Sequence, residues 1–336
     1  MAKYKLGEIC EIVSGSTPKT GIAEYWDGNL KWITPAEIDD ESYIITDSAR
    51  KLTELGVKKT GLSPFPSGTV ILSSRAPIGK VAIAGCEMYC NQGFKNLICS
   101  DRINNRYLYW FLKGNTAYLN SLGRGATFKE ISKKIVSDIE INVPEISQQL
   151  AAVDALERVS EIIRLRKNQL QKLDELVKAR FVELFGDCKS MVSMNELCSI
   201  ITDGTHQPPR FQESGIPFIF VSNLVGNVVT YNAEKFISED TYAELYKRTP
   251  IEIGDLLLST VGSYGHPAVV TEDRKFLFQR HIAYLKPRHN MVNSFYLHSA
   301  LLAPDGQRQI EEKVKGIAQK TLNLSEIKKI VVPLPT

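Results

Sequence analysis

Side chains with strong hydrogen-bonding groups occupy positions that correspond between the two halves of this sequence, but the residue types differ from one half to the other. The differing sets are Arg75 and Val261, Lys80 and His266, and Asn91-Gln92-Gly93 and Gln279-Arg280-His281. Arg, Asn, Gln and Lys are the residues that pair with base edges in the DNA major groove, and Lys and Arg also contact phosphates. A constant frame that carries different side chains of this kind favours two domains that recognise two different ligands.

The candidate DNA-contacting residues extend to other turns and to the segment before the last strand of each half. In the first half they are Thr17, Lys19, Arg75, Lys80, Asn91, Gln92, Lys95, Arg124 and Lys129. In the second half they are His206, Ser263, Tyr264, His266, Arg280, His281 and Lys320. For any one of them the alternative is a solvated surface side chain. We expect four of them to leave their turns and enter a groove: Arg75, Lys80, Gln92 and Lys95.

Sequence motifs for catalysis are absent. There is no G-x-G-x-x-G after a strand, no G-x-x-x-x-G-K-[ST] loop, no H-E-x-x-H and no G-x-S-x-G. All five histidines lie in the second half, so an active site shared by both halves could not use them. We therefore expect no catalytic residue, no metal site and no cofactor bound by this chain. Two alternatives stay open: an interaction scaffold, and a nuclease or methyltransferase that uses carboxylates such as Asp138, Glu140 or Asp255.

An internal repeat carries these residues. "SGTVILSSRAPIGKVAIA" from Ser67 matches "IGDLLLSTVGSYGHPAVV" from Ile253, and Gly68, Ser73 and Gly79 each stand 186 positions before their counterparts. Four further pairs of segments match in the same order, with offsets of 186 to 191. They begin at Glu8 and Glu196, Trp32 and Phe218, Asn104 and Val292, and Gly125 and Gly316. Because unrelated strands would not keep this order, we interpret the halves as one domain present twice.

Each copy combines short strands with one or two helices. The patterns predict strands at 70–73, 256–259 and 282–285, and helices at 105–112 and 294–302. Strands and helices do not alternate regularly along the chain, so the predicted fold class of each copy is α+β.

The segment between the copies has the pattern of one long helix. Residues 146–185 contain no Gly or Pro, and Gly186 follows as a helix stop. Apolar residues recur every seven positions over about four heptads, which predicts a coiled coil roughly 55–60 Å long. The predicted seam consists of Leu156, Ile163, Leu170, Leu173, Val177 and Leu184. The alternative is an amphipathic helix that lies on one domain.

These patterns predict three regions: a first domain at 1–145, a spacer helix at 146–186 and a second domain at 187–336. The net charge is only +3, from 41 basic and 38 acidic residues, so DNA would have to be bound through local basic patches. No apolar run approaches the roughly 20 residues of a membrane span, and the start of the chain has no signal-peptide core. We expect a cytoplasmic protein without a membrane partner and with reduced cysteines.

Two such domains separated by one long helix resemble the specificity subunit of type I restriction-modification enzymes. The motifs that carry the likeness are "KLGEICEIVSGSTPKT", "KWITPAEI", "FPSGTVILSSRAPIGKVAI", "NQGFKNL" and "GATFKEISKKIVSDIEINVPEISQQLAAV". Together they extend the resemblance over essentially the whole chain.

The resemblance implies that each copy is a target recognition domain that reads one half of a split site in double-stranded DNA. It implies that the helix holds the half-sites at a fixed spacing and docks methyltransferase subunits, with restriction subunits as further partners. S-adenosylmethionine would then be bound by the methyltransferase subunits. The lack of an N-P-P-[YFW] motif in this sequence agrees with that division of labour.

One departure from the family concerns the end of the chain. In the family a second helix follows the second domain and packs antiparallel on the first helix. Here Pro335 matches Pro144 and the sequence stops at Thr336, where a counterpart of "EISQQLAAV" would begin. We therefore expect the seam to need another partner, either a second copy of the chain pairing through residues 146–186 or the methyltransferase subunits.

Overall fold

The computed structural model describes residues 2–75, 77–125, 129–316 and 319–335. The chain forms two compact units, Met1–Leu165 and Arg166–Thr336. The division falls inside the long helix, because each end of that helix packs on the domain next to it. Within the predicted match of the segments from Gly125 and Gly316, residues 126–128, 317 and 318 lie outside the described residues. None of the helices in the described ranges combines the length and apolar character that a membrane span requires.

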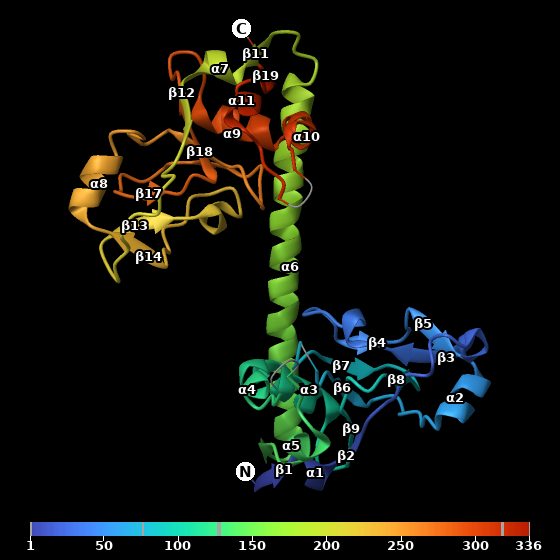
Figure 1. Ribbon diagram of the computed structural model, residues 1–336. Helices are drawn as coiled ribbons and strands as arrows, with labels where there is room; N and C mark the ends of the chain where they lie inside the picture. Colours follow the sequence, from blue (N-terminus) through green and yellow to red (C-terminus); the bar gives the residue numbers. More distant parts are fainter. Residues whose placement is uncertain (1, 76, 126–128, 317–318, 336) are drawn as a thin grey trace. The chain divides into compact units, whose positions relative to one another are not determined.

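The first unit is built on a five-stranded sheet (Figure 1). Its strand order is β2-β9-β6-β7-β4, and only the β4–β7 pair is parallel. The strands are β2 (Cys10–Val13), β9 (Asn96–Cys99), β6 (Val70–Leu72), β7 (Val81–Ala84) and β4 (Ile44–Ile45). A smaller sheet has the order β5-β3-β8, from β5 (Arg50–Leu52), β3 (Trp26–Ile33) and β8 (Tyr89–Cys90). The pair of β1 (Ala2–Lys5) and β10 (Glu140–Val143) completes the strands of this unit in the described ranges.

Helices cover one face of the larger sheet and bury the main core against it. Helix α3 packs on β6 and β7, and Leu108 and Leu112 of this helix are completely buried. The helices of this unit before the long helix are α1 (Leu6–Ile9), α2 (Glu54–Thr60), α3 (Asn105–Gly114), α4 (Thr116–Ser121) and α5 (Lys133–Ser137), with 3-10 turns η1 (Ala23–Tyr25) and η2 (Pro35–Glu37).

The second unit repeats this plan. Its larger sheet has the order β12-β18-β15-β16, from β12 (Cys198–Asp203), β18 (Ile282–Pro287), β15 (Leu256–Ser259) and β16 (Pro267–Val269). The smaller sheet has the order β14-β13-β17, and β11 pairs with β19. These strands are β14 (Lys235–Ile237), β13 (Ile216–Ile219), β17 (Leu277–Phe278), β11 (Met191–Ser193) and β19 (Val331–Pro333). The helices are α7 (Met194–Leu197), α8 (Glu239–Leu245), α9 (Ser294–Leu302), α10 (Pro304–Lys313) and α11 (Leu324–Ile327), with η3 (Val221–Leu224).

The observed elements confirm the α+β class and the repeat, with one shift of register. Asn104 caps α3 by accepting hydrogen bonds from the amides of Arg106 and Tyr107. Asn293 caps α9 in the same way, so Asn104 corresponds to Asn293. The prediction that paired Asn104 with Val292 was wrong by one residue, because helix caps are fixed by side-chain geometry that apolar patterning does not resolve.

The long helix α6 (Ile146–Phe185) has the predicted ends. Its first turns are anchored to the first unit by Gln149, a buried residue whose amide donates to the carbonyls of Arg102 and Pro144 and whose oxygen accepts from the amide of Asn104. Glu157 pairs further along with Arg106 of α3. A buried polar group is stable only when it is fully hydrogen-bonded, so Gln149 fixes where the helix begins.

The last turns of α6 are anchored to the second unit by aromatic packing. Phe181 and Phe185 lie with their ring centroids 5.4 and 5.1 Å from the ring of Tyr296 on α9. Phe181 is buried, and Phe185 packs beside it.

The predicted seam does not contribute to either anchor. Its six residues are between 44% (Leu156) and 64% (Leu170) exposed. Residues that pack on the units, such as Val153 and Phe181, lie elsewhere on the helix. The alternative of a helix whose apolar stripe lies on one domain is therefore wrong for this structure.

Two equivalent glycines allow a turn to approach the strand beside it in each unit. The amide of Ser16 donates to the carbonyl of Cys90 at 3.0 Å, and that of Thr205 to the carbonyl of Phe278 at 2.9 Å. A Cβ atom on the preceding residue would stand 1.8 Å from the Cys90 oxygen at Gly15, and 2.3 Å from the Phe278 oxygen at Gly204. Both positions therefore require glycine.

We predict that Gly15→Ala lowers the free energy of unfolding by about 1–3 kcal/mol, because the backbone must move to admit the methyl group. Gly21→Ala is the matched control, since a Cβ atom at Gly21 meets no atom within 4 Å. Thermal melting followed by circular dichroism measures both variants. Equal midpoints for the two variants would show that the close approach at Gly15 is unimportant.

Candidate nucleic-acid interface

Three backbone segments meet beside the larger sheet of each unit, and we call this place the junction. In the first unit it consists of residues 73–75, 91–93 and 130–131, and in the second of residues 259–261, 279–281 and 321–322. The amide of Ser74 donates to the carbonyl of Gly93 at 2.7 Å, and the carbonyl of Ser74 accepts from the amide of Ile131 at 2.9 Å. The corresponding bonds in the second unit join Thr260 to His281 at 2.9 Å and Leu322 to Thr260 at 2.8 Å.

Isolated β-bridges at the junction are also duplicated. Arg75 and Arg124 both bridge to Glu130, and Val261 and Lys315 both bridge to Thr321. The junction is thus one backbone arrangement that carries different side chains in the two units.

The structure brings several predicted residues of the first unit to this junction. Arg75, Gln92, Arg124 and Lys129 are exposed there. Thr17 donates to the side-chain oxygen of Gln92 at 2.5 Å, so the turn that contains Thr17 joins the same surface.

Three other predicted residues of the first unit have mainly local roles in the structure. The ammonium of Lys80 donates to the carbonyl of Pro35 at 3.1 Å, and the side chain of Asn91 accepts from the amide of Gly93 at 2.9 Å. Lys19 is exposed, and its carbonyl accepts from the indole of Trp26 at 3.3 Å. Lys80 and Asn91 are partly buried, and their hydrogen bonds to backbone groups stabilise the turns on which they lie.

The expectation that Lys95 leaves its turn was wrong. Lys95 is only 7% exposed, and its ammonium donates to Ser74 at 3.3 Å and to Glu130 at 3.4 Å. A buried ammonium requires an anionic partner, and Glu130 supplies it. Glu130 also accepts from the Nε of Arg75 at 3.0 Å. Glu130 was not among the residues predicted from the sequence, where its one signal is the correspondence with Thr321.

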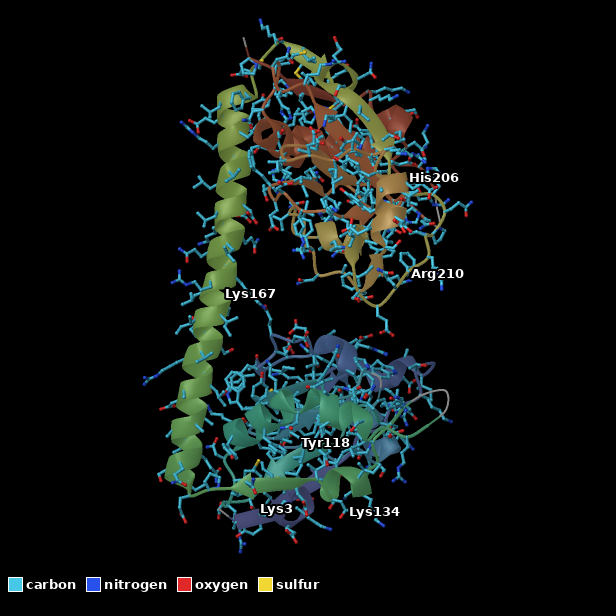
Figure 2. The ribbon with its side chains drawn as sticks, turned by 90° about the vertical axis from the view of Figure 1, so that its left-hand side faces the viewer. Lys3, Tyr118, Lys134, Lys167, His206 and Arg210 are labelled. Carbon is cyan, nitrogen blue, oxygen red and sulfur yellow. The ribbon has the colours of Figure 1, made fainter. Side chains whose placement is uncertain are left out.

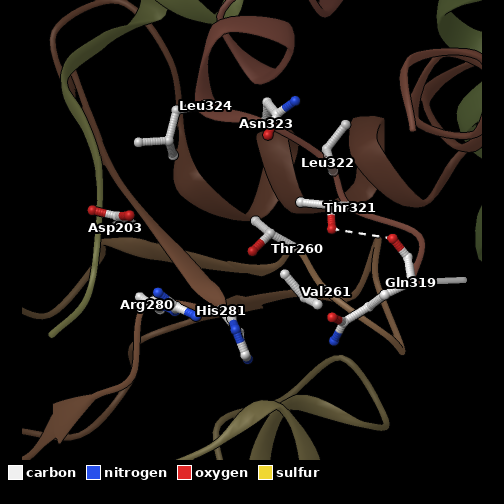
Figure 3. A pocket seen from close by; sticks show the side chains of 10 residues that line it. All are labelled: Asp203, Thr260, Val261, Arg280, His281, Gln319, Thr321, Leu322, Asn323 and Leu324. Carbon is white, nitrogen blue, oxygen red and sulfur yellow. Dashed lines mark hydrogen bonds between the residues drawn. The ribbon is translucent and has the colours of Figure 1, made fainter. Parts of the chain in front are cut away.

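The junction of the second unit opens into a pocket of about 270 Å³ (Figure 3). Arg280 and His281 line it, together with Thr260, Val261 and Thr321. Burial and the neighbouring Arg280 lower the pKa of His281 from its ordinary value of 6.5. At neutral pH this imidazole is therefore uncharged and offers one hydrogen-bond donor and one acceptor.

His206 lies on the loop that follows β12, and the same loop carries Arg210, a cation that was not among the predicted residues (Figure 2). The imidazole of His206 is 2.7 Å from the carboxylate of Asp203, which also accepts from Arg248 at 2.6 Å. Asp203 in turn lines the pocket at the junction. The loop is thus held beside the pocket.

The remaining predicted residues form two clusters in the second unit. His266 bonds to Ser263 and to the side chain of Asn227, at 3.1 Å each. Lys320 donates to Glu311 at 2.8 Å and to the hydroxyl of Tyr264 at 3.2 Å. Tyr264 also donates to Glu311, so the Lys320 charge is largely compensated within this cluster.

The chemistry available at both junctions is hydrogen bonding by Arg, Gln, His and Thr side chains. Within residues 2–75, 77–125, 129–316 and 319–335, no group of three or more His, Cys, Asp or Glu side chains is placed to hold a metal ion.

The chain matches the family model described as "Type I restriction modification DNA specificity domain" over residues 1–175 and 190–336. The MjaIX specificity subunit of Methanocaldococcus jannaschii is 30% identical, over 98% of this chain and 82% of that protein. The EcoBI specificity subunit of Escherichia coli is 28% identical, over 70% of this chain and 56% of that protein.

Two solved structures share the fold. One, from a study of complex assembly and conformational transition of the type I R-M system, has a TM-score of 0.56 at 20% identity, over 99% of this chain and 85% of that one. The other is the S subunit from M. genitalium, with a TM-score of 0.51 at 14% identity, over 98% of this chain and 83% of that one. The family matches and the 30% identical relative show that this chain belongs to the type I restriction-modification specificity subunits, which determine the DNA sequence specificity of the system and leave catalysis to partner subunits.

Proposed function

We propose that each unit reads one half of a bipartite, asymmetric site in double-stranded DNA. The observation that carries this proposal is the duplicated junction, where identical backbone hydrogen bonds hold different side chains in the two units. Different donors and acceptors on one frame select different base edges. The exposed cations Arg124, Lys129 and Arg210 are suited to phosphate contacts, which position the protein on the duplex.

The partners follow from this role. We propose that the chain works in the cytoplasm with methyltransferase subunits, which bind S-adenosylmethionine and modify adenine, and with restriction subunits, which cleave. A scaffold without DNA recognition would bind these partners but confer no sequence preference. A hidden nuclease or methyltransferase would act on DNA without them.

We further propose that α6 sets the gap between the half-sites and docks the methyltransferase subunits. The anchors at Gln149 and Phe181 attach one end of the helix to each unit, and the 40 residues between Ile146 and Phe185 form one helix. A helix of that length rises about 60 Å.

We propose that in the isolated chain the exposed seam of α6 pairs with the seam of a second copy. The two helices would run antiparallel about a two-fold axis. The six Leu, Ile and Val side chains of the seam are about half exposed and forgo on the order of 10 kcal/mol of burial, so the seam favours association. Arg166 precedes Leu170 by four positions, and Asp174 follows it by four. An antiparallel pair of helices centred on Leu170 therefore brings Arg166 of each copy near Asp174 of the other.

Exchanging residues 1–145 for the matching domain of a specificity subunit of known site should replace one half-site and preserve the other. Sequencing of methylated adenines in DNA modified by the complex measures this. A change in both half-sites at once would contradict independent reading by the two units.

Inserting four residues after Asn168 lengthens a helix by about 6 Å, or nearly two base pairs of B-DNA, and also rotates its far end. We expect a longer gap and unchanged half-sites in the methylated sequence. Asn168→Ala, which keeps the helix length, is the control and should leave the gap as it is. An insertion variant with the original gap would show that α6 does not set it.

Leu170→Glu places a charge in the seam and should shift the isolated chain from dimer or aggregate toward monomer. Light scattering measures this shift. Asn168→Glu places the same charge on the opposite helix face and should have no such effect. A wild-type chain that is monomeric at micromolar concentration would contradict self-association. The methyltransferase subunits would then be the partner of the seam.

A further inference from the structure

Three charged side chains of the first unit form an ordered series at its junction, which we call the ionic cluster: Lys95, Glu130 and Arg75. The side chain of Lys95 is 9% exposed, that of Glu130 is 35% exposed and that of Arg75 is 46% exposed. The series therefore runs from inside the domain to its surface. Lys95 holds the carboxylate of Glu130, and Glu130 holds the guanidinium of Arg75.

The geometry of the ionic cluster determines which atoms of Arg75 remain available. One oxygen of Glu130 accepts from the Lys95 ammonium at 3.4 Å, and the other accepts from the Nε of Arg75 at 3.0 Å. The two terminal nitrogens of Arg75 have no partner within the described part of the chain. An arginine held at Nε presents these nitrogens as a fixed fork, which loses little conformational freedom on binding.

We infer that Arg75 pairs with a guanine edge in the DNA that the first unit reads, and that Glu130 and Lys95 are positioning residues for Arg75. This inference rests on the proposed function. A fixed guanidinium fork matches the O6 and N7 acceptors of guanine in a bidentate pair. The same fork also matches two phosphate oxygens. Phosphate contacts at this junction are available from the exposed side chains of Arg124 and Lys129, which have no ionic partner in the described residues, so they do not require a cation fixed by two neighbours.

The second unit lacks every member of the cluster. The same sheet register places Val261 where the first unit has Arg75, Ala283 where it has Lys95, and Thr321 where it has Glu130. The ammonium of Lys95 lies against Ser74 and Glu130, whose counterparts Thr260 and Thr321 line the open pocket. Guanine recognition of this form is therefore confined to the first half-site.

The test uses the full chain assembled with its methyltransferase subunits. The complex is incubated with S-adenosylmethionine and genomic DNA from a methylation-deficient bacterium. The positions of the methylated adenines are then determined by sequencing. Arg75→Val, which introduces the residue of the second unit, should relax one guanine position of one half-site and no position of the other. With duplexes that differ only at that base pair, discrimination should fall about 5- to 150-fold, the equivalent of about 1–3 kcal/mol.

Control and conservative variants separate recognition from general effects. Lys3→Met removes an exposed lysine that pairs with Glu140 in the same unit, and the methylated site should not change. Arg75→Lys keeps the charge but loses the fork, so it should relax the same position. This variant also provides the test if Arg75→Val fails to fold.

A double-mutant cycle tests the positioning role of Glu130. Because Glu130→Gln alone would leave the buried ammonium of Lys95 unpaired, it is combined with Lys95→Met. This pair of changes should relax the same base pair as Arg75→Val, and adding Arg75→Val to it should lower discrimination no further, because both sets of changes remove the same contact of Arg75 with the base. A purely structural role would instead lower binding to all sequences and add to the effect of Arg75→Val.

Several results would overturn the inference. They are an unchanged site for a folded Arg75 variant, relaxation at a base pair other than guanine, and a uniform loss of affinity across sequences, which would indicate a phosphate contact. If the wild-type complex methylates no specific sequence, the proposed function itself fails. A specific wild-type site with an unaffected Arg75 variant refutes the inference alone.

Discussion

Backbone hydrogen bonds at the junction are the constraint on which the rest of this structure depends. In each unit a single residue, Ser74 or Thr260, donates to one neighbouring segment and accepts from another. Because backbone groups make these bonds, the arrangement is independent of the side chains that the three segments carry. Residues there can change without altering the fold, and this separation of frame from side chain allows one domain to serve twice in one chain.

The two junctions differ in whether a charged or a small apolar side chain is buried next to them. In the first unit Lys95 fills the space beneath the junction and must be compensated by Glu130, since an unpaired buried charge costs several kcal/mol. In the second unit Ala283 is fully buried at the corresponding position, and the junction is lined by neutral Thr260 and Thr321, which face a pocket. One unit thus presents a fixed cation, and the other presents a cavity flanked by Arg280 and an uncharged His281.

The sequence allowed the repeat, the fold class and both ends of the long helix to be predicted, because these depend on local patterns. Helix α6 begins and ends where Pro144 and Gly186 require, and α9 matches the predicted range. Strands of two residues, such as β8, show no periodicity, so the division of each copy into two sheets was not predicted. Lys95 was expected to leave its turn because side chains beside turns can reach solvent, and its partner Glu130 lies 35 residues away in the sequence. The roles of the candidate residues in contacting DNA remain predictions.

The most direct test of the central claim is photocrosslinking from each junction to DNA that carries the methylated site. A photoreactive phenylalanine derivative replaces Gln92 in one variant and Arg280 in another, and the crosslinked nucleotides are mapped in the assembled complex. We predict crosslinks from residue 92 to one half-site only and from residue 280 to the other half-site only. Crosslinks from both positions to the same half-site, or to the gap between the half-sites, would contradict the account.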